Sequence, residues 1–117
     1  MSAMVALTPV GGESSTRVRV VVPFDLRHSA DLRQGFVQAI RVGGDPIIVD
    51  LAGSTVVDQV GFATLLGAHA RAARAGRRLR FTNADQRTER LLRRAGLVRL
   101  LDDVPAPRVA VRRRAAV

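Results

Sequence analysis

The sequence predicts an α/β fold, with a mixed sheet of four or five strands packed against three helices in a single domain. Residues 46–51 form a continuous apolar run rich in β-branched side chains, typical of a strand buried on both faces of a parallel sheet. Segments with strand and helix patterns alternate along the chain, which favours right-handed crossovers. With 117 residues, of which 47% are hydrophobic, the chain is long enough to bury one core.

The first strand and helix are predicted from the N-terminal third of the chain. Alternating residues at 16–22 indicate a strand that ends at Pro23. Ser29 is a suitable N-cap for the helix that follows, and the pair Gly43-Gly44 is expected to end that helix.

A strand followed closely by a helix is the central feature of the sequence. After the apolar run 46–51 comes a break, and Asp58 then precedes a helix predicted over residues 60–75. An aspartate at this position can cap the first helical amides, and the helix dipole favours negative charge there. We therefore expect the functional site at this junction.

The last elements are predicted with shorter patterns. Residues 77–82 alternate like a strand, and either Asn83 or Asp85 caps a third helix that ends at Gly96. Residues 97–101 are interpreted as a final short strand.

The domain organisation follows from these elements. Residues 1–13 are expected to form a loose segment or an edge strand, residues 14–103 the domain, and residues 104–117 a basic, disordered tail. The sequence contains no run of eighteen apolar residues and no signal-peptide pattern, so a cytoplasmic location is expected.

The charge of the chain is strongly positive and unevenly distributed. The net charge of +9 comes from 19 arginines, since lysine is absent. Ten of the arginines lie between His69 and Arg99, where the acidic residues are Asp85 and Glu89. This Arg-rich face suggests nucleic acid or an acidic partner, and a solvated surface is the simpler alternative. Trp and Tyr are absent, which argues against stacking on single strands.

The sequence offers little for catalysis or metal binding. Cysteine is absent, and His28 and His69 lack the spacing of metal ligands. Neither histidine is placed by the sequence near an activated hydroxyl, and no phosphate-binding glycine motif occurs. We expect no enzyme activity, no metal and no cofactor, and we interpret His69 as a partly buried core residue.

Four stretches in the same order resemble one known family. They are Asp25-Leu26 at the entrance to the first helix, the central strand and loop at 47–58, Asp58 and Gly61 at the two ends of an Asp-Ser-Ser/Thr-Gly signature, and the closing helix and Gly-Leu turn at 91–101. Together they resemble the STAS domain of anti-sigma factor antagonists. The resemblance implies a regulatory module that binds an anti-sigma factor, a kinase of the histidine-kinase-like ATPase type, and thereby frees a sigma factor.

The chain departs from this family at the regulatory position. The kinase of the family phosphorylates a serine directly after the signature aspartate, and the added charge disturbs partner binding. Here that position is Gln59, which has no hydroxyl, and Val60 follows it. The resemblance therefore implies a partner-binding surface without the phosphorylation switch. Its residues are Asp25, Asp58, Gln59, Val60 and Gly61.

Several roles remain open within this prediction. Asp58 is interpreted mainly as a helix N-cap, with partner contact alongside, and Asp25 either orders its loop or contacts the partner. The nearby hydroxyls of Ser54, Thr55 and Thr64 are expected to satisfy local backbone groups. Two alternative functions are a basic nucleic-acid-binding protein that uses the Arg-rich face, and a STAS subunit of a transport complex.

Overall fold

The computed structural model describes residues 4–7, 15–42 and 44–101, so the predicted tail at 104–117 lies outside the described residues. Its strands are β1 (Met4–Leu7), β2 (Thr16–Val20), β3 (Ile47–Asp50) and β4 (Leu79–Thr82). Its helices are α1 (Ser29–Val42), α2 (Gln59–Arg74) and α3 (Gln86–Arg94), with the 3-10 turns η1 (Leu26–His28) and η2 (Val98–Leu100).

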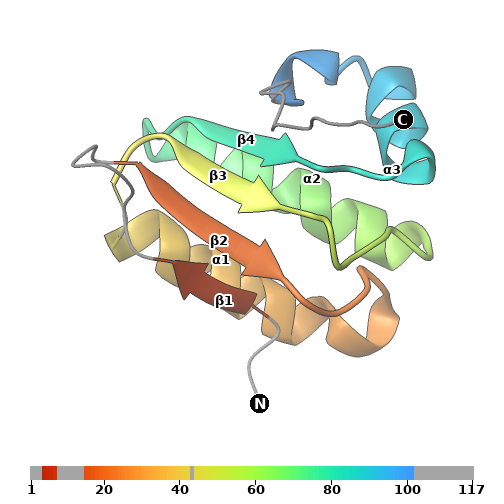
Figure 1. Cartoon of the computed structure of the whole chain (residues 1–117), viewed down its shortest axis with the longest axis horizontal. Helices are drawn as coiled ribbons and strands as arrows, with labels where there is room; N and C mark the ends of the chain where they lie inside the picture. Colours follow the sequence, from red (N-terminus) through yellow and green to blue (C-terminus); the bar gives the residue numbers. More distant parts are fainter. Residues whose placement is uncertain (1–3, 8–14, 43, 102–117) are drawn as a thin grey trace, which may run out of the picture.

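The four strands form one mixed sheet in the order β1-β2-β3-β4 (Figure 1). Strands β2, β3 and β4 are parallel, and β1 pairs antiparallel with β2 at the edge. Strand β3 therefore lies between two parallel neighbours, as the apolar run 46–51 predicts. The α/β prediction with a mixed sheet of four or five strands is confirmed.

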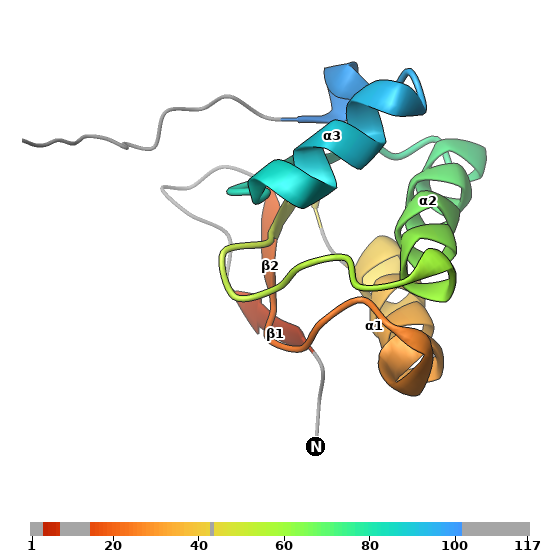
Figure 2. The same ribbon diagram turned by 90° about the vertical axis from the view of Figure 1, so that its right-hand side faces the viewer.

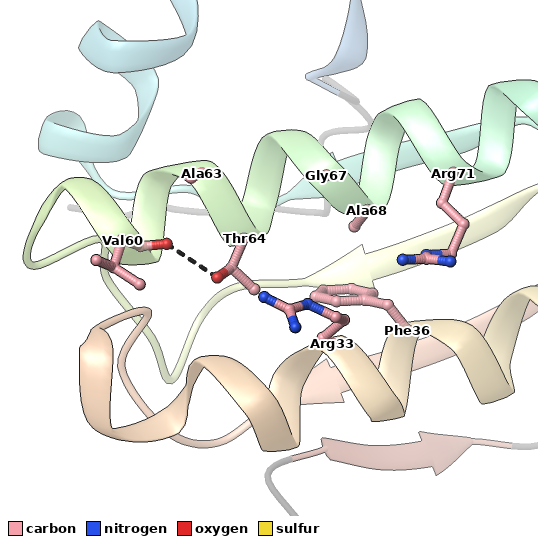
Figure 3. Close-up of a pocket in the computed structure, with 8 residues that line it drawn as sticks. All are labelled: Arg33, Phe36, Val60, Ala63, Thr64, Gly67, Ala68 and Arg71. Atoms are coloured by element: carbon pink, nitrogen blue, oxygen red, sulfur yellow. Dashed lines mark hydrogen bonds between the residues drawn. The ribbon is translucent and has the colours of Figure 1, made fainter.

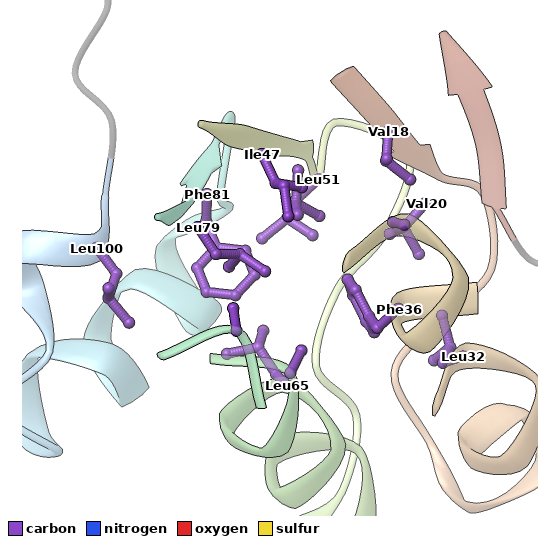
Figure 4. Packing of buried hydrophobic residues seen from close by; sticks show 14 of the residues in the cluster. Val18, Val20, Leu32, Phe36, Ile47, Leu51, Leu65, Leu79, Phe81 and Leu100 are labelled. Atoms are coloured by element: carbon purple, nitrogen blue, oxygen red, sulfur yellow. The ribbon is translucent and has the colours of Figure 1, made fainter. Parts of the chain in front are cut away.

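One face of the sheet is covered by α1 and α2, which lie on the same side (Figure 2). The core between them contains Val18 and Val20 from β2, and Ile47 and Phe81 from β3 and β4 (Figure 4). Ile47 and Val49 are both 0% exposed. Alternate residues of the strands point toward the helices because side chains in a strand alternate between faces.

The opposite face of the sheet carries no helix within the described residues. In register across this face lie Arg17, Ile48 and Arg80, and Ile48 is 9% exposed. The prediction that three helices cover the sheet is thus only partly right. Helix α3 lies beside β4 and contributes Leu92 to the core from that side (Figure 1).

The entrance to the first helix differs from the prediction. Ser29 is not an N-cap: it has helical dihedral angles, and its hydroxyl donates to the carbonyl of Leu26. The cap is Asp25, whose carboxylate accepts from the backbone N–H of His28 at 3.0 Å. The physical reason is the 3-10 turn η1, which starts three residues earlier than the apolar periodicity of α1.

The C-terminal elements also differ in part. Of the two candidate caps for α3, the structure uses Asp85, which accepts from the N–H of Thr88 at 2.8 Å. The predicted strand at 97–101 is wrong: residues 98–100 form η2, and only Leu101 bridges to Phe81 of β4. Five apolar or long residues in this segment did not distinguish a short turn from a short strand.

We expect the two faces of β3 to differ in their tolerance of truncation. Ile47→Ala should lower the free energy of unfolding by about 2–5 kcal/mol, because the cavity would open in the closed core. Ile48→Ala should cost less, since its side chain lies among arginines on the face without helices. Urea denaturation of both variants measures this, and an equal loss would contradict the open face.

Candidate functional site

The loops that follow β2, β3 and β4 meet at one edge of the sheet, because the three strands are parallel. We call the residues of these loops, 21–25, 51–58 and 83–88, the loop cluster. Backbone hydrogen bonds join the first two loops: the N–H of Phe24 donates to the carbonyl of Thr55 at 2.8 Å, and that of Val57 to the carbonyl of Phe24 at 2.9 Å. The predicted junction before α2 therefore lies in the middle of this cluster.

Asp58 holds two segments together. One carboxylate oxygen accepts from the N–H of Gly61 at 2.8 Å and caps α2, as predicted. The other accepts from the N–H of Leu26 at 3.1 Å, which belongs to η1. Since both oxygens are used, Asp58 fixes the start of α2 against the entrance of α1.

Gly61 allows the closest backbone approach in this region. A Cβ atom placed on Gly61 would lie 1.8 Å from the carbonyl oxygen of Phe24 and 2.8 Å from the nitrogen of Asp25. No side chain larger than hydrogen fits there without displacing the backbone. The glycine at this position is thus required by packing between the first turn of α2 and the loop after β2.

Asp25 has a local structural role. Besides the N–H of His28, its carboxylate contacts the ring nitrogen Nδ1 of His28 at 2.7 Å. Burial alone would raise the pKa of Asp25, but these hydrogen bonds and the charge of Arg27 lower it. Of the two roles left open for Asp25, ordering its own loop is the one that these contacts display.

The third loop is attached through side chains that the sequence prediction missed. Arg87 donates from Nε to the carbonyl of Val56 at 2.6 Å and from Nη2 to that of Val57 at 3.2 Å. The hydroxyl of Thr88, which is buried, accepts from the N–H of Val56 at 3.3 Å. The first turn of α3 therefore holds the loop before α2 from the opposite side.

A buried carboxylate orders the base of the loop cluster. Asp50 accepts from the N–H of Ala52 and the side chain of Asn83, both at 3.0 Å, and pairs with Arg19 at 3.5 Å. Burial alone would raise the pKa of Asp50, but these partners lower it. The only sequence signal for this role is a carboxylate at the end of an otherwise apolar strand.

Apolar side chains surround the start of α2 and remain open to solvent. Leu26 is 66% exposed, Val57 48% and Val60 40%, and Gln59 between them is also exposed. These four residues are neighbours because Leu26 is bound to Asp58, which lies between Val57 and Gln59. We call them the α2 rim.

The hydroxyls near the α2 rim are all engaged. Ser54 donates to the carbonyl of Val22 at 2.7 Å, and Thr55 hydrogen-bonds to Asp85. Thr64 is 8% exposed and donates to the carbonyl of Val60 at 2.9 Å, as the dashed line in Figure 3 shows. The predicted structural roles of Ser54 and Thr64 are confirmed.

A groove of about 210 Å³ continues from the α2 rim between α1 and α2. Its floor includes Phe36, and Val60 and Thr64 line the end nearest the rim (Figure 3). Arg33 of α1 and Arg71 of α2 extend over it from opposite helices (Figure 3). The exposed apolar surface is thus continuous with a basic groove.

The family of the chain follows from comparison with known proteins. A family model described as "Mlab, STAS domain" matches residues 10–102. The chain belongs to the STAS-domain family. A search of curated proteins finds no match to it.

Two solved structures show the same STAS fold. The anti-sigma factor antagonist SpoIIAA in its unphosphorylated form is 19% identical, with a TM-score of 0.64 over 86% of each chain. A sulfate transporter family protein from Wolinella succinogenes is 18% identical, with a TM-score of 0.63 over 83% of this chain and 76% of that one.

The structure brings the predicted site residues of this STAS domain together. Asp25, Asp58, Gln59, Val60 and Gly61 all lie where the loop after β2 meets the start of α2. His69 lies elsewhere, in the second half of α2, and is partly buried. Across the described ranges, no helix is both long and apolar enough to cross a membrane.

Replacing Gly61 should be far more costly than replacing the other glycine inside α2. Gly61→Ala should lower the free energy of unfolding by about 1–3 kcal/mol or more, because the new methyl group would overlap the Phe24 carbonyl. Gly67→Ala is the matched control: nothing lies within 4 Å of its Cβ position, so a gain of about 0.5–1 kcal/mol is expected. Equal effects in urea denaturation would contradict the close approach.

Proposed function

We propose that this STAS domain is a regulatory protein-binding module that docks through the α2 rim onto a kinase-type anti-sigma factor in the cytoplasm. The observation that carries the proposal is the exposure of Leu26, Val57 and Val60 around Gln59. Exposed apolar side chains gathered on a fixed frame are typical of a protein-binding site. The fold shared with an anti-sigma factor antagonist supports the choice of partner.

Binding rather than catalysis is the activity that these residues support. Both oxygens of Asp58 are held by backbone N–H groups, and Asp25 caps η1. Neither carboxylate faces an activated hydroxyl among the contacts of the described residues. The carboxylates therefore shape the surface, and the exposed side chains between them contact the partner.

We further propose that the surface lacks a phosphorylation switch. Gln59 provides an amide where a hydroxyl would be needed, and the nearest hydroxyls are already bonded. A neutral residue at this position keeps the α2 rim permanently free of the charge that a phosphate would add. The module would then be regulated through its abundance or its partner.

A second candidate function uses the same surface with another partner. The sulfate transporter family protein matches the fold about as well as the antagonist does. This favours a STAS subunit of a transport complex as the alternative. The two functions differ in which protein the α2 rim binds, so identification of the bound protein decides between them.

Substitutions in the α2 rim should weaken partner binding without unfolding the domain. The immobilised chain is used to capture partners from extracts of its source cells, and calorimetry with the purified partner follows. Leu26→Arg and Gln59→Arg should each raise the dissociation constant at least about tenfold, because a charge would be buried against the apolar contact.

Val42→Arg is the matched control for this experiment. Val42 is 69% exposed, similar to Leu26, but lies at the far end of α1. Its replacement should leave affinity unchanged, and all three variants should keep their melting temperature. If Val42→Arg weakens binding as much as Leu26→Arg, the interface is not the α2 rim; capture of a transporter component would favour the second candidate.

The absence of a switch is tested by intact-mass spectrometry. After incubation with the partner kinase and ATP, the wild type should gain no phosphate. Gln59→Ser should gain one, because the new hydroxyl lies exposed in the first turn of α2, where the helix dipole tolerates negative charge. A phosphate on the wild type, mapped to Ser54 or Thr64, would contradict the unswitched module.

A further inference from the structure

A second cleft lies at the other end of the parallel strands from Asp58. It has a volume of about 290 Å³ and opens between the second half of α2, the start of β4 and η2. His69 belongs to its α2 wall, and Leu79 and Leu100, both nearly buried, form apolar parts of its lining. This cleft shares no lining residue with the α1–α2 groove.

Four arginines line the cleft: Arg77, Arg78, Arg80 and Arg99. They arrive from two distant parts of the sequence, the β4 strand with the turn before it and η2. No acidic residue belongs to the lining. The Arg-rich face predicted from the sequence is therefore concentrated here into a concave site.

Two of the arginines form the frame of the site. Arg77 donates to the carbonyls of Ile40 and Gly44, and its Nε lies 3.4 Å from a carboxylate oxygen of Asp45. Arg78 donates from Nε to Asp45 at 2.8 Å. These bonds fix the turn before β4 and use the carboxylate of Asp45.

The other two arginines have donors that the described residues leave available. Arg80 and Arg99 take part in none of the ion pairs within the described residues, and both are exposed. Arg99 makes one bond of 3.3 Å to the carbonyl of Gly96. A guanidinium group carries five N–H donors, so most of the donors of this pair are free for a ligand.

His69 reports on the same positive field. Burial lowers the pKa of His69, and the charge of Arg99 lowers it further. The ring is therefore neutral at physiological pH and offers one donor and one acceptor. Its neighbourhood combines a fixed polar group with excess positive charge.

We propose that this cleft binds a small phosphorylated molecule, with Arg80 and Arg99 holding the phosphoryl group and His69 and the apolar lining contacting the rest. Guanidinium groups match the geometry of phosphate oxygens in bidentate pairs. The volume is close to the lower end of small-ligand pockets, roughly 300 Å³, so the ligand is compact. The site is independent of the protein-binding function proposed above.

A nucleic acid would supply the same phosphate chemistry but fits the surface less well. Of the four phenylalanines, Phe24, Phe36 and Phe81 are buried and Phe62 packs against the core. No described aromatic ring is therefore free to stack on an exposed base, as single-strand binding requires. The experiment separates the two sources of phosphate.

Calorimetry of the full chain at low ionic strength tests the proposal with two probes, inorganic pyrophosphate and phenyl phosphate. The wild type should bind both in the millimolar range or tighter, each at one site. Arg80→Gln and Arg99→Gln should each weaken binding by about tenfold or more, the usual effect of removing a charged hydrogen-bond donor.

Arg90→Gln is the matched control, because Arg90 is exposed on α3, outside the cleft lining, and its loss changes the net charge equally. It should leave the affinity unchanged. Equal weakening by all three substitutions, or no binding of either probe by the wild type, overturns the proposal. A single-stranded oligonucleotide that binds more tightly with length, and equally well to the Arg80 and Arg99 variants, would assign the arginines to nucleic acid instead.

Discussion

The geometry of the binding surface depends on one contact, the approach of the Phe24 carbonyl to the α-carbon of Gly61. The loop after β2 can cross the first turn of α2 only because this position lacks a side chain. Asp58 then joins the two segments, with one oxygen on each. Because the contact lies between elements about thirty residues apart, it couples the local structure of the loop to the overall topology, and the exposed residues beside it inherit a fixed arrangement.

Much of the fold could be predicted because several signals agreed. The run 46–51 predicted a buried central strand, and β3 at Ile47–Asp50 lies between two parallel neighbours. Asp58 predicted a helix N-cap, and α2 begins at the next residue. In both places the local pattern and the tertiary packing ask for the same residues, so one sequence was enough to identify them.

The parts that failed are those where local pattern and tertiary context diverge. Ser29 is a good N-cap by type, but a 3-10 turn capped by Asp25 precedes it, and apolar periodicity carries no signal for such a turn. The exposure of Leu26 and Val57 could not be predicted either, since apolar residues are expected inside. The basic cleft was visible only as charge, because Arg80 and Arg99 meet through the return of η2 to β4.

The chemistry of the α2 rim follows from how its carboxylate is used. Asp58 spends both oxygens on backbone N–H groups, so its charge is directed into the frame rather than toward solvent. The helix dipole at the start of α2 is offset by the same carboxylate. What faces outward is a neutral amide, Gln59, beside Leu26 and Val60, a combination that resembles the charge-poor centre of a protein interface. Under the proposed function, the partner therefore presents an apolar face to this surface, and a charge added at residue 59 would oppose binding by desolvation as much as by repulsion.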